Sequence, residues 1–203
     1  MANFGDFLLV KMEIKDKDGA TLEEGREEGD VYIYGLNSIL PVVDREVALM
    51  KEGEVRDIKA MPEEAYGPKN PDLIKTLPAS NFKEKPSQGE LIEMNSGGRT
   101  FKGIVKKVEG GRVTVDFNHP YAGKELLFHI EVKKIAREEK PKIELILHQF
   151  DAGKDVDVDW DGKKLVVKSE DAYKNIAPTM SYLFPEYKLE LKAKKKEESQ
   201  DKD

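Results

Sequence analysis

The sequence predicts an α+β fold built mostly from antiparallel strands, and three observations lead to this class. Residues 7–14 alternate apolar and polar side chains, which is typical of a half-buried strand. Apolar residues recur at helical spacing between Pro41 and Gly53, so we expect one short helix there. From Glu90 onward, short β-like segments are separated by Gly-rich turns, which favour hairpins.

The first 67 residues predict four strands and the short helix. The first strand carries its apolar side chains on one face, at Leu8, Val10, Met12 and Ile14. Residues 31–35 are rich in β-forming side chains and predict a strand, and we expect two more strands at 20–24 and 54–60. In the helix, the side chains expected to face a core are Val43, Val47 and Met50. Pro62 then opens a turn that presents the tripeptide Ala65-Tyr66-Gly67.

The middle of the chain has a different texture. Residues 68–88 are rich in Pro, Lys, Asn and Ser, with isolated apolar positions. The segment 90–117 predicts a meander of three strands, because Asn-Ser-Gly-Gly and Glu-Gly-Gly supply the positive-φ positions that hairpins need. A loop at 118–123 follows, and residues 126–135 predict one more strand.

The C-terminal part predicts a small α+β unit. We expect a linker at 137–142, because this stretch is charged and contains a proline. Beyond it we expect a hairpin with Asp161-Gly162 at the turn, a short helix at 170–177 that ends before Pro178, and a last strand. Residues 194–203 are almost all polar or charged, and we expect this tail to be disordered.

Composition excludes several classes of function. The 203 residues contain no cysteine, which excludes disulfides, thiol catalysis and Cys-based zinc sites and fits a reducing cytoplasm. The N-terminus lacks the pattern of a signal peptide, and no run of about 18 apolar residues exists, so we expect a cytoplasmic protein that does not enter a membrane. A net charge of −6 argues against general nucleic-acid binding.

Metal binding is not expected. The three histidines, His119, His129 and His148, are isolated in the sequence. The carboxylates of the acidic run 155–161 alternate along one strand face, whereas calcium needs them arranged around a loop. We therefore expect neither a metal nor a cofactor.

Two segments carry a resemblance to a known family. The stretch 34–67, which ends in Ala65-Tyr66-Gly67, and the stretch "NHPYAGKELLFHIEV" in 118–135 resemble FKBP-type peptidyl-prolyl cis-trans isomerases. The similarity is closest to the SlyD branch and the archaeal long-type FKBPs, in which an insert-in-flap domain interrupts the chain after the Ala-Tyr-Gly turn. The resemblance implies an antiparallel sheet curled around a short helix. It also implies an isomerase domain at 1–67 plus 115–137, an insert at 68–114, a C-terminal domain at 138–193 and a tail at 194–203.

The family places the substrate proline in an apolar cup between sheet and helix. Carried onto this sequence, the substrate-binding side chains of the cup are Leu22, Ile39, Leu40, Val43 and Tyr121. The resemblance assigns the catalytic roles to Tyr66, Phe128 and Glu23, although Tyr66 also fits a plain core position and Glu23 a solvated turn. Isomerisation needs no nucleophile, metal or general base, since the enzyme only has to favour the twisted amide.

Four positions depart from the usual pattern of the family. Glu23 is one methylene longer than the usual Asp, Met12 and Asp30 replace common aromatic residues, and Val43 is a smaller floor than Trp or Leu. These changes keep an alternative open, namely a holdase or binding module with the same fold and little isomerase activity.

The resemblance also implies a partner. The family uses the insert for chaperone-like binding, so we expect unfolded or nascent polypeptides containing proline as partners, and no nucleic acid or membrane. The insert residues expected to capture them, or else to form the insert's own core, are Leu73, Ile74, Leu77, Phe82, Leu91, Ile92, Met94 and Phe101. A homodimer through the C-terminal domain is the family-level expectation.

Overall fold

The computed structural model describes residues 1–36 and 40–192, which fall into two compact units. The first unit contains Met1–Ile14, Leu22–Ile58 and the described chain from Phe128 onward. The second contains Lys15–Thr21 and Lys59–Leu127. The protein is a mixed α+β structure with antiparallel sheets and few helices, as the sequence predicts. None of the helices in the described part of the chain is long and apolar enough to cross a membrane.

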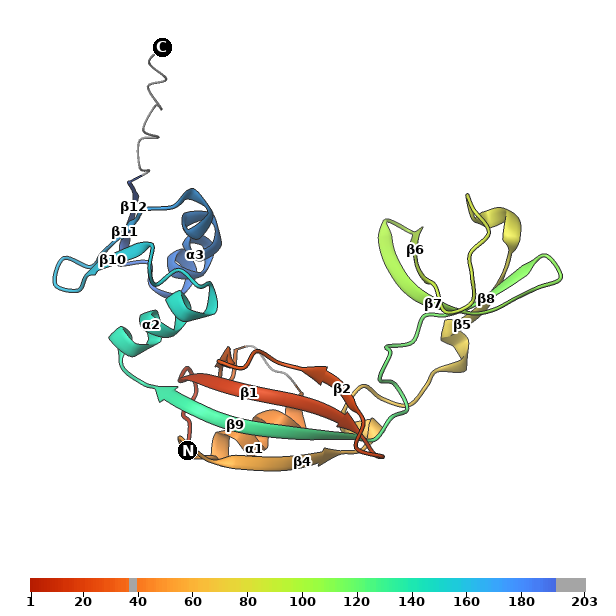
Figure 1. Cartoon of the computed structure of the whole chain (residues 1–203), viewed down its shortest axis with the longest axis horizontal. Helices are drawn as coiled ribbons and strands as arrows, with labels where there is room; N and C mark the ends of the chain where they lie inside the picture. Colours follow the sequence, from red (N-terminus) through yellow and green to blue (C-terminus); the bar gives the residue numbers. More distant parts are fainter. Residues whose placement is uncertain (37–39, 193–203) are drawn as a thin grey trace, which may run out of the picture. The chain divides into compact units, whose positions relative to one another are not determined.

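A five-stranded sheet holds most of the first unit together (Figure 1). Its strand order is β2-β1-β9-β4, and β3 pairs antiparallel with β1. The strands are β1 Phe7–Asp16, β2 Thr21–Glu24, β3 Asp30–Ile33, β4 Val55–Ala60 and β9 Leu126–Ala136. All five were expected from the sequence, and β9 brings residues from far downstream into the sheet beside β1.

Helix α1 spans Pro41–Leu49, as the sequence predicts. Pro41 is its first helical residue, where the missing N–H costs nothing because the first turn has no acceptor for it. The expected core-facing side chains Val43, Val47 and Met50 are completely buried. This apolar stripe, rather than capping, anchors the helix, since its N-cap residue Leu40 makes no side-chain cap hydrogen bond.

A second sheet lies wholly within residues 74–116. Its order is β5-β8-β7-β6, all antiparallel, with β5 Ile74–Pro78, β6 Leu91–Ser96, β7 Arg99–Glu109 and β8 Arg112–Asp116. The predicted three-strand meander is β6, β7 and β8, but the prediction missed β5. The Pro- and Lys-rich composition around β5 does not suggest a strand. The segment becomes one because it pairs with β8, about 40 positions later in the chain. Val105, Val113 and Val115 form the small buried core of this sheet.

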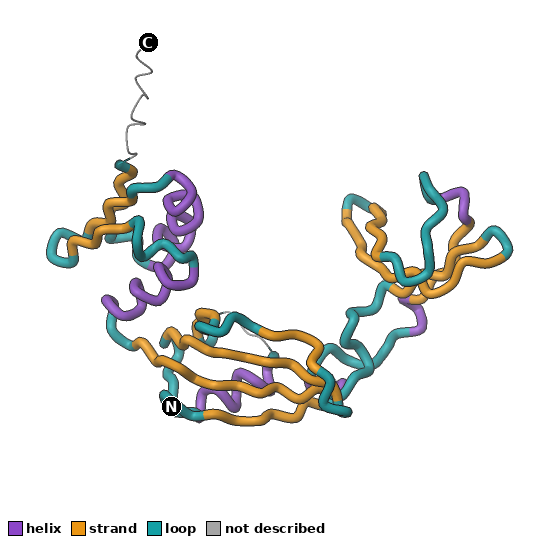
Figure 2. The backbone as a smooth tube through the Cα atoms, in the orientation of Figure 1, coloured by secondary structure: helices purple, strands orange, loops and turns teal. Residues whose placement is uncertain are grey.

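The C-terminal part consists of helices α2 Glu139–Gln149 and α3 Glu170–Leu183 with the strands β10 Val156–Asp159, β11 Lys164–Val167 and β12 Lys188–Leu191 (Figure 2). The strands form one sheet in which β10 and β12 flank β11. The core of this part includes Phe7 and Ala136 from the first sheet together with Ile143, Ile176 and Phe184.

Two expectations for this part are wrong, and both misread a proline. Residues 139–142 of the predicted linker at 137–142 form the start of α2, because Pro141 falls in the first turn, where a missing N–H is tolerated. The helix expected to end before Pro178 continues to Leu183. An interior proline costs about 3 kcal/mol, and complete burial of Ile176 and Met180 on the apolar face of α3 offsets this cost.

Candidate functional site

The tripeptide Ala65-Tyr66-Gly67 forms a tight turn after β4. A single 3-10 turn at Pro62–Glu64 precedes it, and the Gly67 N–H donates back to the Pro62 carbonyl at 2.6 Å. Gly67 has φ +74°, a conformation that disfavours any other residue. The Gly67 carbonyl accepts from the Gly123 N–H at 2.8 Å, so the turn is fastened to the loop that re-enters the first sheet.

This re-entry loop meets Tyr66 with a cluster of aromatic rings. The imidazole of His119 stacks on the Tyr66 ring with centroids 3.9 Å apart and planes 2° from parallel. The Tyr121 ring meets both edge-on, at 5.5 Å from Tyr66 and 5.4 Å from His119. The Tyr121 N–H donates to His119 Nδ1 at 3.2 Å, which orients the imidazole. The ring plane of Tyr66 is therefore set by side chains more than 50 residues away in the sequence.

The two connections to the second sheet are fastened to each other by Asn118. Its Oδ1 accepts from the Asn70 N–H at 2.8 Å, and its Nδ2 donates to the Asn70 carbonyl at 3.0 Å. The Asn118 amide and side chain also donate to Asp116 Oδ1, at 2.9 and 2.8 Å. Lys69 pairs with the other oxygen of Asp116 at 3.3 Å. We call the set Lys69, Asn70, Asp116 and Asn118 the clasp.

Asp116 is one of two buried acidic side chains among the described residues, and its charge is stabilised by the clasp. Burial acts to raise the pKa of its carboxyl group. The hydrogen bonds from Asn118 and the Lys69 ammonium outweigh burial and hold the pKa below its ordinary value of 3.8. A carboxylate whose pKa is depressed by folding stabilises the native state above its unfolded pKa, and that contribution is lost as the pH falls through the folded pKa.

We predict that Asp116→Asn destabilises the second unit at neutral pH by about 1.5–3 kcal/mol, the usual contribution of hydrogen bonds to a charged group. The difference from the parent protein should narrow below about pH 4, because the parent carboxylate is then protonated as well. Amide hydrogen exchange of β8 at pH 7 and at acid pH measures both quantities. A difference that is independent of pH would contradict this account of Asp116.

The other predicted cup residues lie in the first unit. Leu40, Val43 and Phe128 are buried, Leu22 is half-buried, and Glu23 is exposed. Ile39 lies outside the described residues. Tyr66, His119 and Tyr121 all belong to the second unit, where the rings of His119 and Tyr121 contact the ring of Tyr66. The roles predicted for these residues stay predictions at this point.

The second sheet carries two cavities. The first, of about 270 Å³, is lined by Leu73, Lys75, Leu77, Met94, Phe101 and Phe117. The second, of about 730 Å³, has Phe82, Leu91, Ile92 and Met94 among its lining residues. Seven of the eight insert residues singled out from the sequence thus line one cavity or the other; Ile74 lines neither and is 41% exposed. Met94 is common to both cavities.

Sequence reasoning missed several residues of this region. His119 looked isolated because its stacking partner is distant in the sequence, and Asp116 and Asn118 became visible only when both connections were placed together. Phe117 lines the first cavity and lies close to Gly103, where a Cβ would be 2.6 Å from its ring. Among the described residues, no three His, Asp or Glu side chains form a group that could hold a metal ion.

The chain is similar to known proteins of one family. The family model "FKBP26, IF domain" matches residues 78–121. The chain is 36% identical over 100 residues to a probable FKBP-type 16 kDa peptidyl-prolyl cis-trans isomerase of Pseudomonas fluorescens, covering 48% of this chain and 67% of the relative. It is 30% identical over 133 residues to the FKBP-type 16 kDa isomerase of Escherichia coli K12, covering 63% and 89%. It is 26% identical over 149 residues to SlyD of Helicobacter pylori J99, covering 71% and 80%.

Identity of this extent over most of a relative, together with the matched inserted segment, decides the family. The chain belongs to the FKBP-type peptidyl-prolyl cis-trans isomerases and carries an insert-in-flap domain.

Proposed function

We propose that this isomerase turns X-Pro bonds in an apolar cup, with substrate-binding roles for Leu22, Ile39, Leu40, Val43 and Tyr121 and catalytic roles for Tyr66 and Phe128. The FKBP arrangement, a sheet curled around α1 and interrupted after Gly67 by the insert, is part of this proposal. The stack of Tyr66 on His119 is the observation that carries it, because a fixed phenol is what a carbonyl anchor requires. Glu23 is proposed to act at the edge of the cup.

The chemistry needs little more than such a cup. Rotation about an X-Pro amide must cross a barrier of roughly 18–20 kcal/mol that resonance in the planar amide imposes. The two planar forms differ by only about 0.5–1 kcal/mol, so the reaction needs no energy source. A cup that removes water from the amide and holds the ring favours the twisted form. The Tyr66 hydroxyl would donate a hydrogen bond to a substrate carbonyl while the bond turns.

We predict that Tyr66→Phe lowers kcat/KM on an X-Pro peptide by about a hundred-fold, the lower end of the range for removing one hydrogen-bond donor from a catalytic site. His119→Leu, which keeps bulk beside Tyr66 but removes the aromatic stack and the Nδ1 acceptor, should lower kcat more than it raises KM. His119→Phe restores a stacking ring and should recover part of the loss. A protease-coupled peptide assay measures these values. A Tyr66→Phe rate equal to that of the parent would remove the anchor from the mechanism.

The insert is proposed to bind unfolded segments. A mostly apolar cavity, a second cavity of mixed lining that shares Met94 with it, and an edge strand, β6, are features that bind extended polypeptide. Phe101 and Leu91 are large apolar side chains that remain 45% and 63% exposed in the folded insert. Exposed apolar side chains of this kind are available to bind a partner. The proposed partners are unfolded or nascent chains that contain proline.

Two further parts of the proposal concern the whole protein. We propose that the C-terminal domain, residues 138–193, forms a homodimer. We also propose that the isomerase domain comprises residues 1–67 and 115–137, and that the insert comprises residues 68–114. The complete lack of cysteine suits work in a reducing cytoplasm. A second candidate function, a holdase that turns over slowly, is favoured by one observation, the small side chain of Val43 at the buried floor of the proposed cup.

A further inference from the structure

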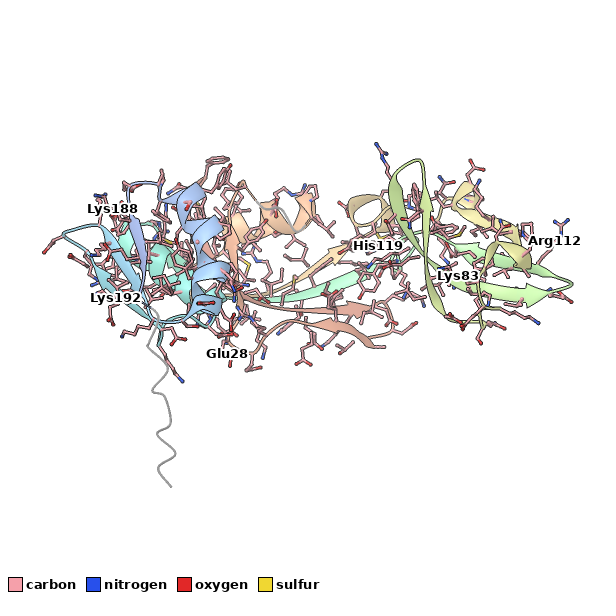
Figure 3. All side chains as sticks on the ribbon, turned by 90° about the horizontal axis from the view of Figure 1, so that it is seen from above. Glu28, Lys83, Arg112, His119, Lys188 and Lys192 are labelled. Carbon is pink, nitrogen blue, oxygen red and sulfur yellow. The ribbon has the colours of Figure 1, made fainter. Side chains whose placement is uncertain are left out.

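Charge is distributed unevenly along this chain. The segment 68–114 contains nine Lys and Arg and five Asp and Glu, a net charge of +4, whereas the whole chain has −6. The rest of the protein therefore has a net charge of −10. Arg112 at the turn between β7 and β8 and Lys83 belong to this basic segment and are marked in Figure 3. Such segregation makes the insert the part of the molecule that attracts negative charge.

One of these cations, Lys75, lies at the apolar cavity. Among the described residues, Lys75 is the only charged one that lines the cavity of about 270 Å³, beside Leu77, Met94 and Phe101. It has no ion pair within the described part of the chain, whereas the nearby Lys102 pairs with Glu93 at 3.1 Å. An apolar cavity with one uncompensated ammonium group at its wall fits an apolar side chain that has a carboxylate next to it.

The neighbouring cavity differs in charge. Its lining includes Lys83 and the carboxylates of Glu84, Glu90 and Glu93. Glu93 is neutralised by Lys102, and Glu90 accepts the Ser87 N–H at 2.7 Å. Selection for a negative charge on a bound segment must therefore come from the first cavity, at Lys75.

We propose that the insert selects client segments in which an acidic residue is adjacent to an apolar or aromatic one, and that Lys75 reads the acidic residue while Leu77, Met94 and Phe101 hold its neighbour. This inference rests on the proposed capture function of the insert and names the class of segment captured. The acidic remainder of the protein repels the same segments, so the basic insert is where they bind first.

The test uses the full chain and three proline-free fluorescent peptides that share a Leu-Phe core flanked by Glu, Gln or Lys. Anisotropy titration gives each Kd at low and at high salt. We expect the Glu peptide to bind about three-fold more tightly than the Gln peptide, as one partly exposed ion pair allows, and the Lys peptide to bind most weakly. The preference should shrink at about 0.5 M salt, where exposed charges are screened.

Two charge-matched variants assign the effect. Lys75→Glu should reverse the order of the peptides, whereas Lys106→Glu should leave it unchanged, because Lys106 is exposed on the same insert and lines neither cavity. Equal Kd values for the three peptides, or tighter binding of the Lys peptide, would overturn the inference and leave capture intact. The same shift in both variants would assign the preference to overall charge and overturn the role of Lys75. If no peptide binds, the capture function itself fails.

Discussion

Replacing residues 75–115 with a short Gly-containing turn is expected to leave the rate of isomerisation of a small X-Pro peptide within about two-fold of that of the parent. The same change is expected to lower catalysis of the refolding of a protein by about a hundred-fold, the lower end of the gain that tethering gives. If the insert captures a client as proposed, the encounter of that client with the cup becomes effectively intramolecular. A tetrapeptide is too short to use both surfaces, so its rate depends on the cup alone.

The structure permits this replacement because Ile74 and Asp116 are directly paired across β5 and β8. A turn of two to four residues closes such an antiparallel pair, and the clasp of Lys69, Asn70, Asp116 and Asn118 stays in place. A subtler variant is Met94→Ser with Phe101→Ser, which makes the first cavity polar. Thr76→Ala is its control, since Thr76 bonds Thr114 and lines neither cavity. Unaltered refolding catalysis in the replacement variant would contradict the proposed role of the insert.

Phe128→Ala is expected to lower the stability of the first unit by about 3–5 kcal/mol, the usual cost of truncating a buried phenylalanine. Phe128 is completely buried on β9, in a row with Leu126, Ile130 and Val132 that is also completely buried. Because the chain has two compact units, a single unfolding transition cannot be assumed, and amide exchange of β1 and β9 is the appropriate measurement.

Phe128→Leu is the matched control for this prediction. It keeps most of the volume and should cost less than about 1.5 kcal/mol. If Phe128 also forms a wall of the cup, Phe128→Leu should lose more activity on an X-Pro peptide than its small loss of stability explains. Equal stability of the alanine variant and the parent would contradict the buried position of this ring.

Local patterns in the sequence were enough to predict the strands and α1. Side-chain direction repeats every two residues in a strand and about every 3.6 residues in a helix. The buried face could therefore be identified from the alternation of Leu8, Val10 and Ile14 and from the spacing of Val43 and Val47. Two prolines were misread, one because a first helical turn tolerates it and one because tertiary packing offsets its cost. Pro141 lies in a first turn, and Pro178 is carried within α3 by the burial of its neighbours.

The candidate site was only partly predictable, for a physical reason. Tyr66 and Tyr121 belong to motifs and were found, whereas the role of His119 depends on a contact with a ring 53 positions earlier. The clasp likewise joins residues 47 or 48 positions apart. Pairings of this kind leave no periodic trace in a single sequence. Lys75 was unremarkable in the sequence because only the fold brings Phe101 and Phe117 beside it.

The most direct test of the account is the refolding of a protein limited by proline isomerisation, with the enzyme present in strongly substoichiometric amount. The account predicts that the rate of the slow phase rises in proportion to enzyme concentration, and that Tyr66→Ala loses most of this effect. A slow phase that is unchanged at every enzyme concentration, together with suppression of aggregation only at stoichiometric amounts, would contradict catalysis in the proposed cup and identify the protein as a holdase.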